Sequence, residues 1–122
     1  MAFLTMKVLT PEGKPFITGK VEKIIFRCYE EDGLGNEVAV YPYHGKTLIR
    51  IPASPVRFVK EGRLNFIAIA GGFVQVGNNL VEVLTPKYEV IQPDENKPLE
   101  KAQQWVQEWE KLPFRKAMIG YL

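Results

Sequence analysis

Short apolar runs separated by turn residues fill the first three-quarters of the chain, and this pattern constrains the fold more than any other feature. The runs cover residues 3–9, 21–28, 38–41, 47–51, 56–60, 64–70, 73–76 and 80–84. The last of them follows Gly77-Asn78-Asn79, which suits a tight hairpin turn because Gly and Asn tolerate positive φ. Short strands at this spacing predict an antiparallel β-sandwich or barrel.

Two sites in this region predict breaks between strands. The segment 52–55 reads Pro-Ala-Ser-Pro and is too rich in Pro for a central strand. Gly71-Gly72 likewise divides the run at 64–70 from the run at 73–76. Both faces of 64–70 are largely apolar, which is typical of a strand inside a two-layer sandwich or of a strand covered by a partner.

The periodicity changes after the polar segment 92–98. Beyond it, apolar residues recur at steps of three and four, which places them on one helical stripe. They are Leu99, Ala102, Trp105, Val106, Trp109 and Leu112. Pro98 suits a first helical turn and Pro113 ends the helix. A lone helix of this length is marginal in water, so we expect it to lie on the sandwich or on another protein.

This change of pattern predicts the domain organisation. We expect an N-terminal β-sandwich domain over residues 1–91 and a linker with a C-terminal helical segment over 92–122. The chain has 122 residues, of which 46% are hydrophobic and 25% charged, as in globular domains. The net charge of +2 is too small to indicate a nucleic-acid partner or direct binding to a lipid surface. No run reaches the ~20 apolar residues of a membrane span, and the N-terminus does not resemble a signal peptide.

The counts of reactive residues exclude several kinds of chemistry. Cys28 and His44 each occur once, so neither an intrachain disulfide nor a Cys/His zinc site can form. Cys28 lies in an apolar run, where a buried and inert thiol is the usual outcome, and a Cys28–His44 nucleophile pair is a minor alternative. With no Ser-His-acid set, we expect no catalytic, cofactor or metal site.

Three groups of residues leave alternatives open. The acidic cluster Glu30-Glu31-Asp32 lacks the spacing of a calcium loop and is read as a solvated loop tip. The basic stretch between Lys46 and Arg63 is either an ordinary solvated face or a surface for an acidic partner. Trp105 and Trp109 either pack on the sandwich or form a partner-binding face.

Read together, four stretches resemble the epsilon subunit of F-type ATP synthases, called delta in mitochondria. They are Val8-Leu9-Thr10-Pro11-Glu12-Gly13 with Phe16, Gly19-Lys20-Val21-Glu22-Lys23-Ile24, Glu37-Val38-Ala39-Val40-Tyr41-Pro42-Tyr43-His44, and Phe66 to Val76 with Asn79 to Leu84. They follow the family's order at nearly its spacing. The resemblance implies a mainly β fold, an antiparallel β-sandwich of about ten strands, followed by a shortened C-terminal α-helical segment.

The resemblance also implies a non-catalytic subunit of the central rotor stalk. In this family the sandwich binds the gamma subunit and contacts the c-ring, so it couples ion transport to ATP synthesis. The catalytic alpha/beta head is a further potential partner. Contact with the membrane is then indirect, through the c-ring, at the cytoplasmic face of the bacterial inner membrane or at an organellar membrane. The alternative is a free-standing β-sandwich that binds a ligand or a peptide.

The resemblance implies interface positions for individual residues. Glu37 matches the family's acidic loop residue near the c-ring, and His44 matches its histidine in the loop after the short strand. Tyr43 stands where the family has Gly. We therefore predict a c-ring interface at Glu37, Tyr43 and His44, and a second partner interface on the helix at Trp105 and Trp109.

Two further expectations concern gamma and the C-terminus. The apolar face that holds Phe66 and Ala68, or the opposite face of that strand, is predicted to pack against gamma. The ATP-binding pattern of some bacterial members has no match after Asp94, so ATP binding is not expected. Because Pro113 stops the one strong helix, we expect the C-terminal segment to lack the inhibitory insertion into the catalytic head that some members use.

Overall fold

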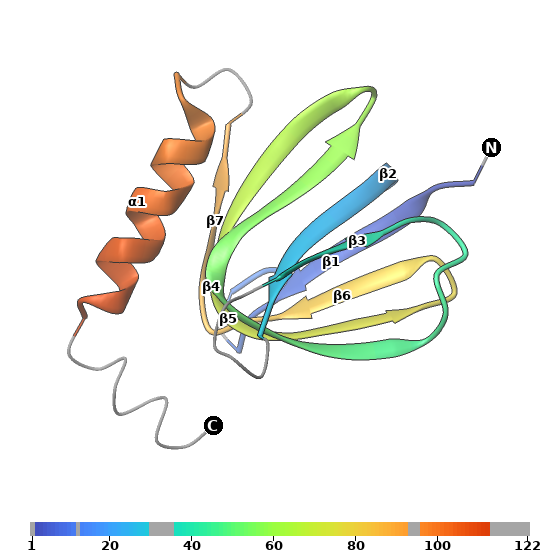
Figure 1. The fold of residues 1–122 in the computed structure, drawn as a ribbon, viewed down its shortest axis with the longest axis horizontal. Helices are drawn as coiled ribbons and strands as arrows, with labels where there is room; N and C mark the ends of the chain where they lie inside the picture. Colours follow the sequence, from blue (N-terminus) through green and yellow to red (C-terminus); the bar gives the residue numbers. More distant parts are fainter. Residues whose placement is uncertain (1, 12, 30–35, 93–95, 113–122) are drawn as a thin grey trace.

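The computed structural model describes residues 2–11, 13–29, 36–92 and 96–112. These residues form seven strands followed by one helix (Figure 1). The elements are β1 (Leu4–Leu9), β2 (Phe16–Cys28), β3 (Asn36–Val40), β4 (Thr47–Lys60), β5 (Arg63–Gly77), β6 (Leu80–Leu84), β7 (Tyr88–Ile91) and α1 (Pro98–Glu110). The acidic cluster at 30–32 and the tail at 113–122 lie outside the described residues.

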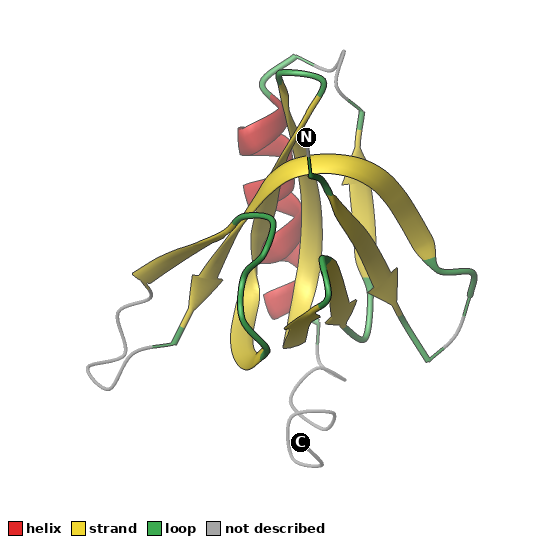
Figure 2. Cartoon of the chain, turned by 90° about the vertical axis from the view of Figure 1, so that its right-hand side faces the viewer, coloured by secondary structure: helices red, strands yellow, loops and turns green. Residues whose placement is uncertain are grey.

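The strands form a sandwich whose two layers share their long strands. β1 pairs with β6, β6 with β5, β5 with β4, β4 with β2, and β2 with β1, so five strands make a closed circuit. All of these pairs are antiparallel except β1 with β6. β3 adds to β2, and β7 adds to β5. Figure 2 shows the long strands curving across the molecule, with α1 behind them.

The predicted sandwich class is confirmed, but the strand count of about ten is not: the described residues contain seven. The difference arises because β4 and β5, of 14 and 15 residues, continue through both predicted breaks. Ile51 pairs with Gly72 and Ala53 with Ala70, so the two strands stay paired through both segments. Figure 2 shows them curving. The Pro-rich segment is tolerated because β2 pairs with β4 only from Arg57 onward, which leaves that edge of β4 open.

The bend in β5 depends on two glycines. Gly71 and Gly72 have φ of +85° and +133°, which L side chains rarely adopt. A Cβ at Gly72 would overlap the carbonyl oxygen of Leu84, and one at Gly71 would lie 3.1 Å from the Ala53 nitrogen. The inward positions of β5 change phase here: Ile67 is buried before the bend and Val74 after it.

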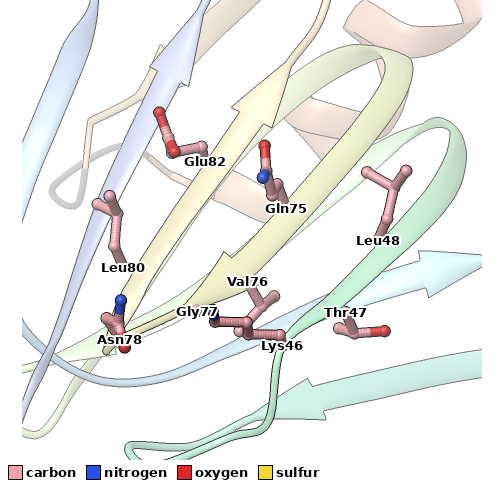
Figure 3. Close-up of a pocket in the computed structure, with 9 residues that line it drawn as sticks. All are labelled: Lys46, Thr47, Leu48, Gln75, Val76, Gly77, Asn78, Leu80 and Glu82. Atoms are coloured by element: carbon pink, nitrogen blue, oxygen red, sulfur yellow. The ribbon is translucent and has the colours of Figure 1, made fainter.

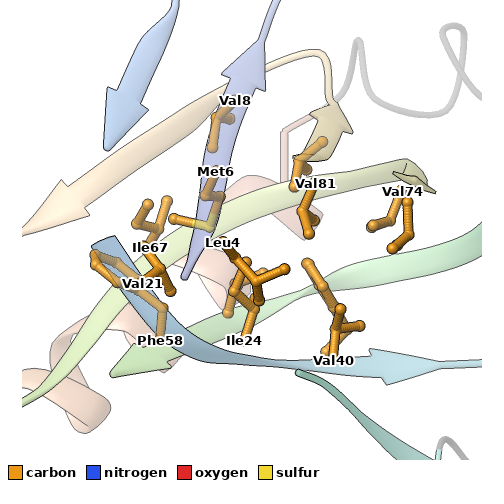
Figure 4. Packing of buried hydrophobic residues seen from close by; sticks show 14 of the residues in the cluster. Leu4, Met6, Val8, Val21, Ile24, Val40, Phe58, Ile67, Val74 and Val81 are labelled. Carbon is orange, nitrogen blue, oxygen red and sulfur yellow. The ribbon is translucent and has the colours of Figure 1, made fainter. Parts of the chain in front are cut away.

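The core of the sandwich is a cluster of apolar side chains, and among the described residues the buried polar ones are Ser54 and Thr85. Its largest fully buried side chains are Phe26, Leu4, Met6, Ile24, Ile51, Ile67 and Ile69. They come from β1, β2, β4 and β5, and valines of β3 and β6 complete the cluster (Figure 4). Burial of such a cluster is the main source of stability in a domain of this size.

Helix α1 lies on the outer surface of the sandwich, as expected from its apolar stripe. Ala102 and Val106 pack on Phe66, Ala68 and Ile91 from β5 and β7. The first half of β5 is therefore covered on both sides, by the core and by α1, which explains why both of its faces are apolar. The helix ends at Glu110, three residues before Pro113.

Candidate functional site: partner-binding surfaces

The turn between β3 and β4 presents an exposed tyrosine on a fixed backbone. The Tyr43 N–H donates to Asn79 Oδ1 at 2.6 Å, and the His44 N–H donates to the Tyr41 carbonyl at 3.2 Å. Tyr43 has φ of 67° and its side chain is 81% exposed. An aromatic residue in the left-handed region is strained, and such strain is concentrated at functional positions.

The structure brings Tyr43 and His44 together but places Cys28 elsewhere. His44 is half-buried, with Nδ1 2.9 Å from the Gly45 carbonyl oxygen. Cys28 pairs with Asn36 at the start of β3, whereas His44 follows the end of that strand, so the two do not form a nucleophile pair. The Cys28 thiol is half-buried, not fully buried as expected, because it ends β2 and donates to the Asn36 carbonyl at 3.2 Å.

Glu37 belongs to a charged group at the other end of β3. Its carboxylate forms an ion pair with Arg57 of β4, and Arg27 of β2 lies directly across the strand pair. The hydrogen bond from Arg57 lowers the pKa of Glu37; partial desolvation opposes this effect, and the charges of Arg57 and Arg27 reinforce it. Because Glu37 lies near the start of β3, it does not share a site with Tyr43 and His44. Its predicted contact with the c-ring stays a prediction.

Arg57 and Glu37 also border a small hollow beside α1. The hollow has a volume of about 150 Å³, and Leu99 and Gln103 of α1 form its other side. Its charged lining contains both signs, so it offers no uniform site for an anion or a cation.

The two tryptophans stack on each other along α1. Their ring centroids are 6.1 Å apart and their planes differ by 2°. Trp109 is only 6% exposed, whereas Trp105 is half-buried. Much of the surface of these two rings is therefore buried within the chain. A partner interface at Trp105 and Trp109 stays a prediction.

The basic stretch does not form one patch. Arg57 is paired with Glu37, Lys60 Nζ donates to Thr18 Oγ1 at 2.9 Å, and the Arg50 guanidinium lies 5.0 Å from the Tyr29 ring centroid. The bend in β4 also separates Lys46 and Arg50 from the residues that follow. A continuous surface for an acidic partner is not assembled from these side chains.

A surface that the sequence did not predict lies beyond the bend. We call it the open face, defined by the outward residues of β4, β5 and β6. They are Leu48, Arg50, Phe73, Gln75, Leu80, Glu82 and Leu84. Leu48, Phe73 and Leu84 are 67%, 41% and 43% exposed. Phe73 pairs with Leu84, and Gln75 lies between Leu48 and Glu82. If β5 alternated without interruption, Phe73 would lie on the core face with Ile67 and Ile69, opposite Phe66 and Ala68. The phase change at the glycines turns Phe73 outward, and it was not apparent from the sequence.

A hollow of about 600 Å³ lies on the open face, next to the β5–β6 turn. Figure 3 shows three of its lining residues, with Leu80 on one side of Gly77 and Leu48 on the other. Lys46, Gln75 and Glu82 supply its polar groups. Gly77 contributes no side chain to this hollow, and the Lys46 side chain lies 3.4 Å from the position that a Cβ at Gly77 would take.

Two further properties of the described ranges concern metal binding and membrane spans. No group of three or more His, Cys, Asp or Glu side chains in these ranges could hold a metal ion. The described residues contain no helix with the length and apolar character of a transmembrane span.

Comparisons with known proteins identify relatives. The model of the family described as "ATP synthase, Delta/Epsilon chain, beta-sandwich domain" matches residues 3–91. The ATP synthase epsilon chain of Desulfitobacterium hafniense is 28% identical over 98 residues, covering 80% of this chain and 67% of that protein. The ATP synthase epsilon chain of Bacillus subtilis is 27% identical over 108 residues, covering 88% and 77%.

Two solved structures share the fold. The first is a chain of the Euglena gracilis mitochondrial ATP synthase, in an assembly described as OSCP/F1/c-ring. The match has a TM-score of 0.57 at 18% identity, and it covers 93% of this chain and 69% of the Euglena chain. The second is a chain of the Tetrahymena thermophila mitochondrial ATP synthase central stalk and c-ring. It has a TM-score of 0.54 at 16% identity, with coverage of 88% and 94%.

Proposed function

Because this chain belongs to the ATP synthase delta/epsilon chain family, we propose that it is a non-catalytic central-stalk subunit of an F-type ATP synthase. In this role it links the gamma subunit to the c-ring and couples ion transport to ATP synthesis. The observation that carries the proposal is the family match over residues 3–91, which includes all seven described strands.

The arrangement of surfaces supports a specific face for gamma. The face of β5 that holds Phe66 and Ala68 lies under α1, and the opposite face lies in the core. Neither is free for a partner while α1 is docked. The open face is uncovered and carries exposed Leu48, Phe73 and Leu84, so it is the proposed surface for gamma.

The turn at Tyr43 and His44 is the proposed contact with the c-ring. The fixed backbone and the exposed ring of Tyr43 suit a surface that must keep its shape against a partner. Glu37, at the opposite end of β3, is proposed as a second and separate c-ring contact, since its side chain is 61% exposed despite the ion pair with Arg57. The chain would then be peripheral to the membrane, through the c-ring, on the cytoplasmic face in a bacterium.

Residues 1–91 would serve as the rotor domain and residues 92–122 as a short arm attached to it. Packing of α1 on the sandwich supports an arm that stays folded against its own domain.

Purification of the tagged chain from its source organism tests the function. We expect gamma, the c-ring and a membrane ATPase to co-purify in fixed ratio. Membranes that lack the chain should hydrolyse ATP without building an ion gradient. A tagged chain that elutes as a monomer without ATPase subunits would contradict the proposal and favour a free-standing binding module.

A further inference from the structure

A single asparagine joins three segments at the end of the sandwich that carries Tyr43. Asn79 follows Asn78 in the β5–β6 turn, and their φ values are 58° and 52°. The backbone carbonyl of Asn79 accepts from the Thr5 N–H of β1 at 2.9 Å. Its side-chain Oδ1 accepts from the Tyr43 N–H at 2.6 Å, across 36 residues of sequence. The turn between β3 and β4 is therefore fastened to the β5–β6 turn and, through it, to β1.

The turn that Asn79 holds has a conformation that its sequence does not favour. The His44 N–H donates to the Tyr41 carbonyl, which closes a β-turn over residues 41–44. Pro42 at the second position and a positive φ at the third are typical of a type II turn, whose third position normally holds Gly. Here the third residue is Tyr43, with φ of 67°.

The hydrogen bond to Asn79 accounts for the persistence of this conformation. The left-handed region is sterically unfavourable for a residue with a bulky side chain, and it persists only where the surroundings fix it. The Tyr43 side chain is 81% exposed, so packing of its ring does not fix the backbone. The acceptor that Asn79 offers to the Tyr43 N–H supplies a constraint from a segment distant in sequence.

We propose that Asn79 is the positioning residue for the surface formed by Tyr43 and His44. Its Oδ1 stabilises the turn conformation in which the Tyr43 ring is exposed, and it holds that turn against the sheet before a partner arrives. Fixing a loop in advance reduces the entropy lost on binding. The role of this surface as a c-ring contact rests on the proposed function, whereas the effect of Asn79 on Tyr43 belongs to the free chain.

Asn79→Gly removes the acceptor and keeps the backbone of the β5–β6 turn. Gly adopts positive φ without strain, and Asn-Gly is strongly preferred in a two-residue hairpin loop with positive φ at both positions, so the variant should fold. Asn78→Gly is the matched control, because Asn78 has nearly the same φ but does not hold the Tyr43 N–H. Asn79→Asp is the rescue variant, since a carboxylate oxygen also accepts from an N–H and Asp tolerates positive φ.

Amide hydrogen exchange of the free full-length chain, followed by NMR, measures the effect on Tyr43 directly. The Tyr43 N–H should exchange at least about fivefold faster in Asn79→Gly than in wild type, as expected for the loss of one hydrogen bond. Asn78→Gly and Asn79→Asp should stay close to wild type. Equal exchange in wild type and Asn79→Gly would overturn the inference. If Asn79→Gly does not fold, wild type decides: protection of the Tyr43 N–H supports the inference, and exchange at the rate of an unstructured peptide overturns it.

Rebinding to membranes measures the consequence for the proposed contact. Catalytic heads reassembled with each full-length variant are mixed with membranes of the same organism from which the heads have been removed, and are then sedimented. Half-maximal rebinding should need an at least about threefold higher concentration with Asn79→Gly, and Asn79→Asp should restore it. In a Tyr43→Gly background, Asn79→Gly should add little further loss, because a residue that acts through Tyr43 has no separate effect.

The outcomes separate this inference from the proposed function. Heads that carry the wild-type chain and fail to rebind contradict the proposed function, while the exchange result for Tyr43 still stands. If wild type rebinds and Asn79→Gly rebinds equally well, the position of the turn has no consequence and only this inference is overturned. An equally large loss from Asn79→Gly in the Tyr43→Gly background would show that Asn79 acts independently of Tyr43, and it would also overturn the inference.

Discussion

At the scale of single residues, backbone conformation decides more than side-chain chemistry. The two glycines of the β5 bend set which residues face outward, and Tyr43 occupies a conformation that usually belongs to Gly. The sequence showed that both faces of 64–70 are apolar, but it did not show which positions of β5 face the core or that the phase changes at the bend. The open face was missed for that reason, although its exposed residues were all visible in the sequence.

Gly72→Ala should cost roughly 3 kcal/mol in the free energy of unfolding or prevent folding. The new Cβ would overlap the Leu84 carbonyl oxygen, so two strands would have to separate. Urea unfolding followed by circular dichroism measures the change. Gly19→Ala is the control, and it should be neutral or stabilise slightly because its surroundings are open. A Gly72→Ala protein with wild-type stability would contradict the described bend.

Tyr43→Gly should raise the free energy of unfolding by about 0.5–1 kcal/mol. The left-handed backbone destabilises a non-Gly residue by roughly 1–2 kcal/mol, which Gly would avoid. The greater conformational freedom of Gly in the unfolded chain offsets part of this stabilisation. Tyr43→Ala keeps the strain and should show no such increase. If both variants are less stable than wild type, the tyrosine ring contributes packing that its exposure does not indicate.

The Glu37–Arg57 pair should add a small pH-dependent stability. The pKa of Glu37 is lowered in the folded chain, so its contribution is complete above the unfolded value of about 4.3 and disappears as pH falls through the folded value. For an exposed pair the contribution is about 0.2–1 kcal/mol. Glu37→Gln should therefore be less stable than wild type at pH 7, and the difference should shrink as pH falls through the lowered pKa of Glu37. A difference that persists below that pKa would argue against the ion pair as its cause.

At the scale of elements, the helix was predictable from sequence and the strand boundaries were not. The stripe from Leu99 to Leu112 repeats with a helical period, and the structure places its buried members, Ala102, Val106 and Trp109, on the sandwich or beside it. The breaks predicted at 52–55 and at Gly71-Gly72 were wrong, because β4 and β5 continue through them. Whether such residues end a strand or bend it depends on the neighbouring strand, which local sequence does not contain.

Ala102→Glu should release α1 while the sandwich stays folded. Ala102 is fully buried against β5 and β7, so a carboxylate there cannot remain hydrated while the helix is docked. Trp105 and Trp109 are the chain's two tryptophans, and their emission should shift to longer wavelength as they become exposed. Gln107→Glu, at an exposed position of the same helix, should leave the emission unchanged. Unshifted emission in Ala102→Glu would mean that the helix is held mainly by other contacts.

At the scale of the whole molecule, the described residues combine one sandwich with one docked helix. The family resemblance gave the fold class and the family, because its motifs are spread along the whole sandwich. The position of α1 over Phe66 and Ala68 could not be inferred, since the same apolar strand face suits a helix or a second protein equally well.

Removal of residues 93–122 tests whether the arm inhibits the proposed complex. We expect ATP hydrolysis by the reassembled ATP synthase to stay close to that of the full-length form, since the helix is occupied on its own sandwich. Co-sedimentation of the truncated chain with the complex is the control for assembly. A large rise in hydrolysis would contradict the expectation and assign an inhibitory role to the arm.

The parallel pair of β1 and β6 has a consequence for how the chain folds. Met6 pairs with Val81, so the circuit of strands closes only between segments that lie far apart in sequence. Contacts of this kind slow folding, because a long loop must be ordered before they form. During synthesis, β1 cannot pair with β6 until β6 has left the ribosome. Closure of the sandwich is therefore expected to be a late step, and the first strand made is among the last to be secured.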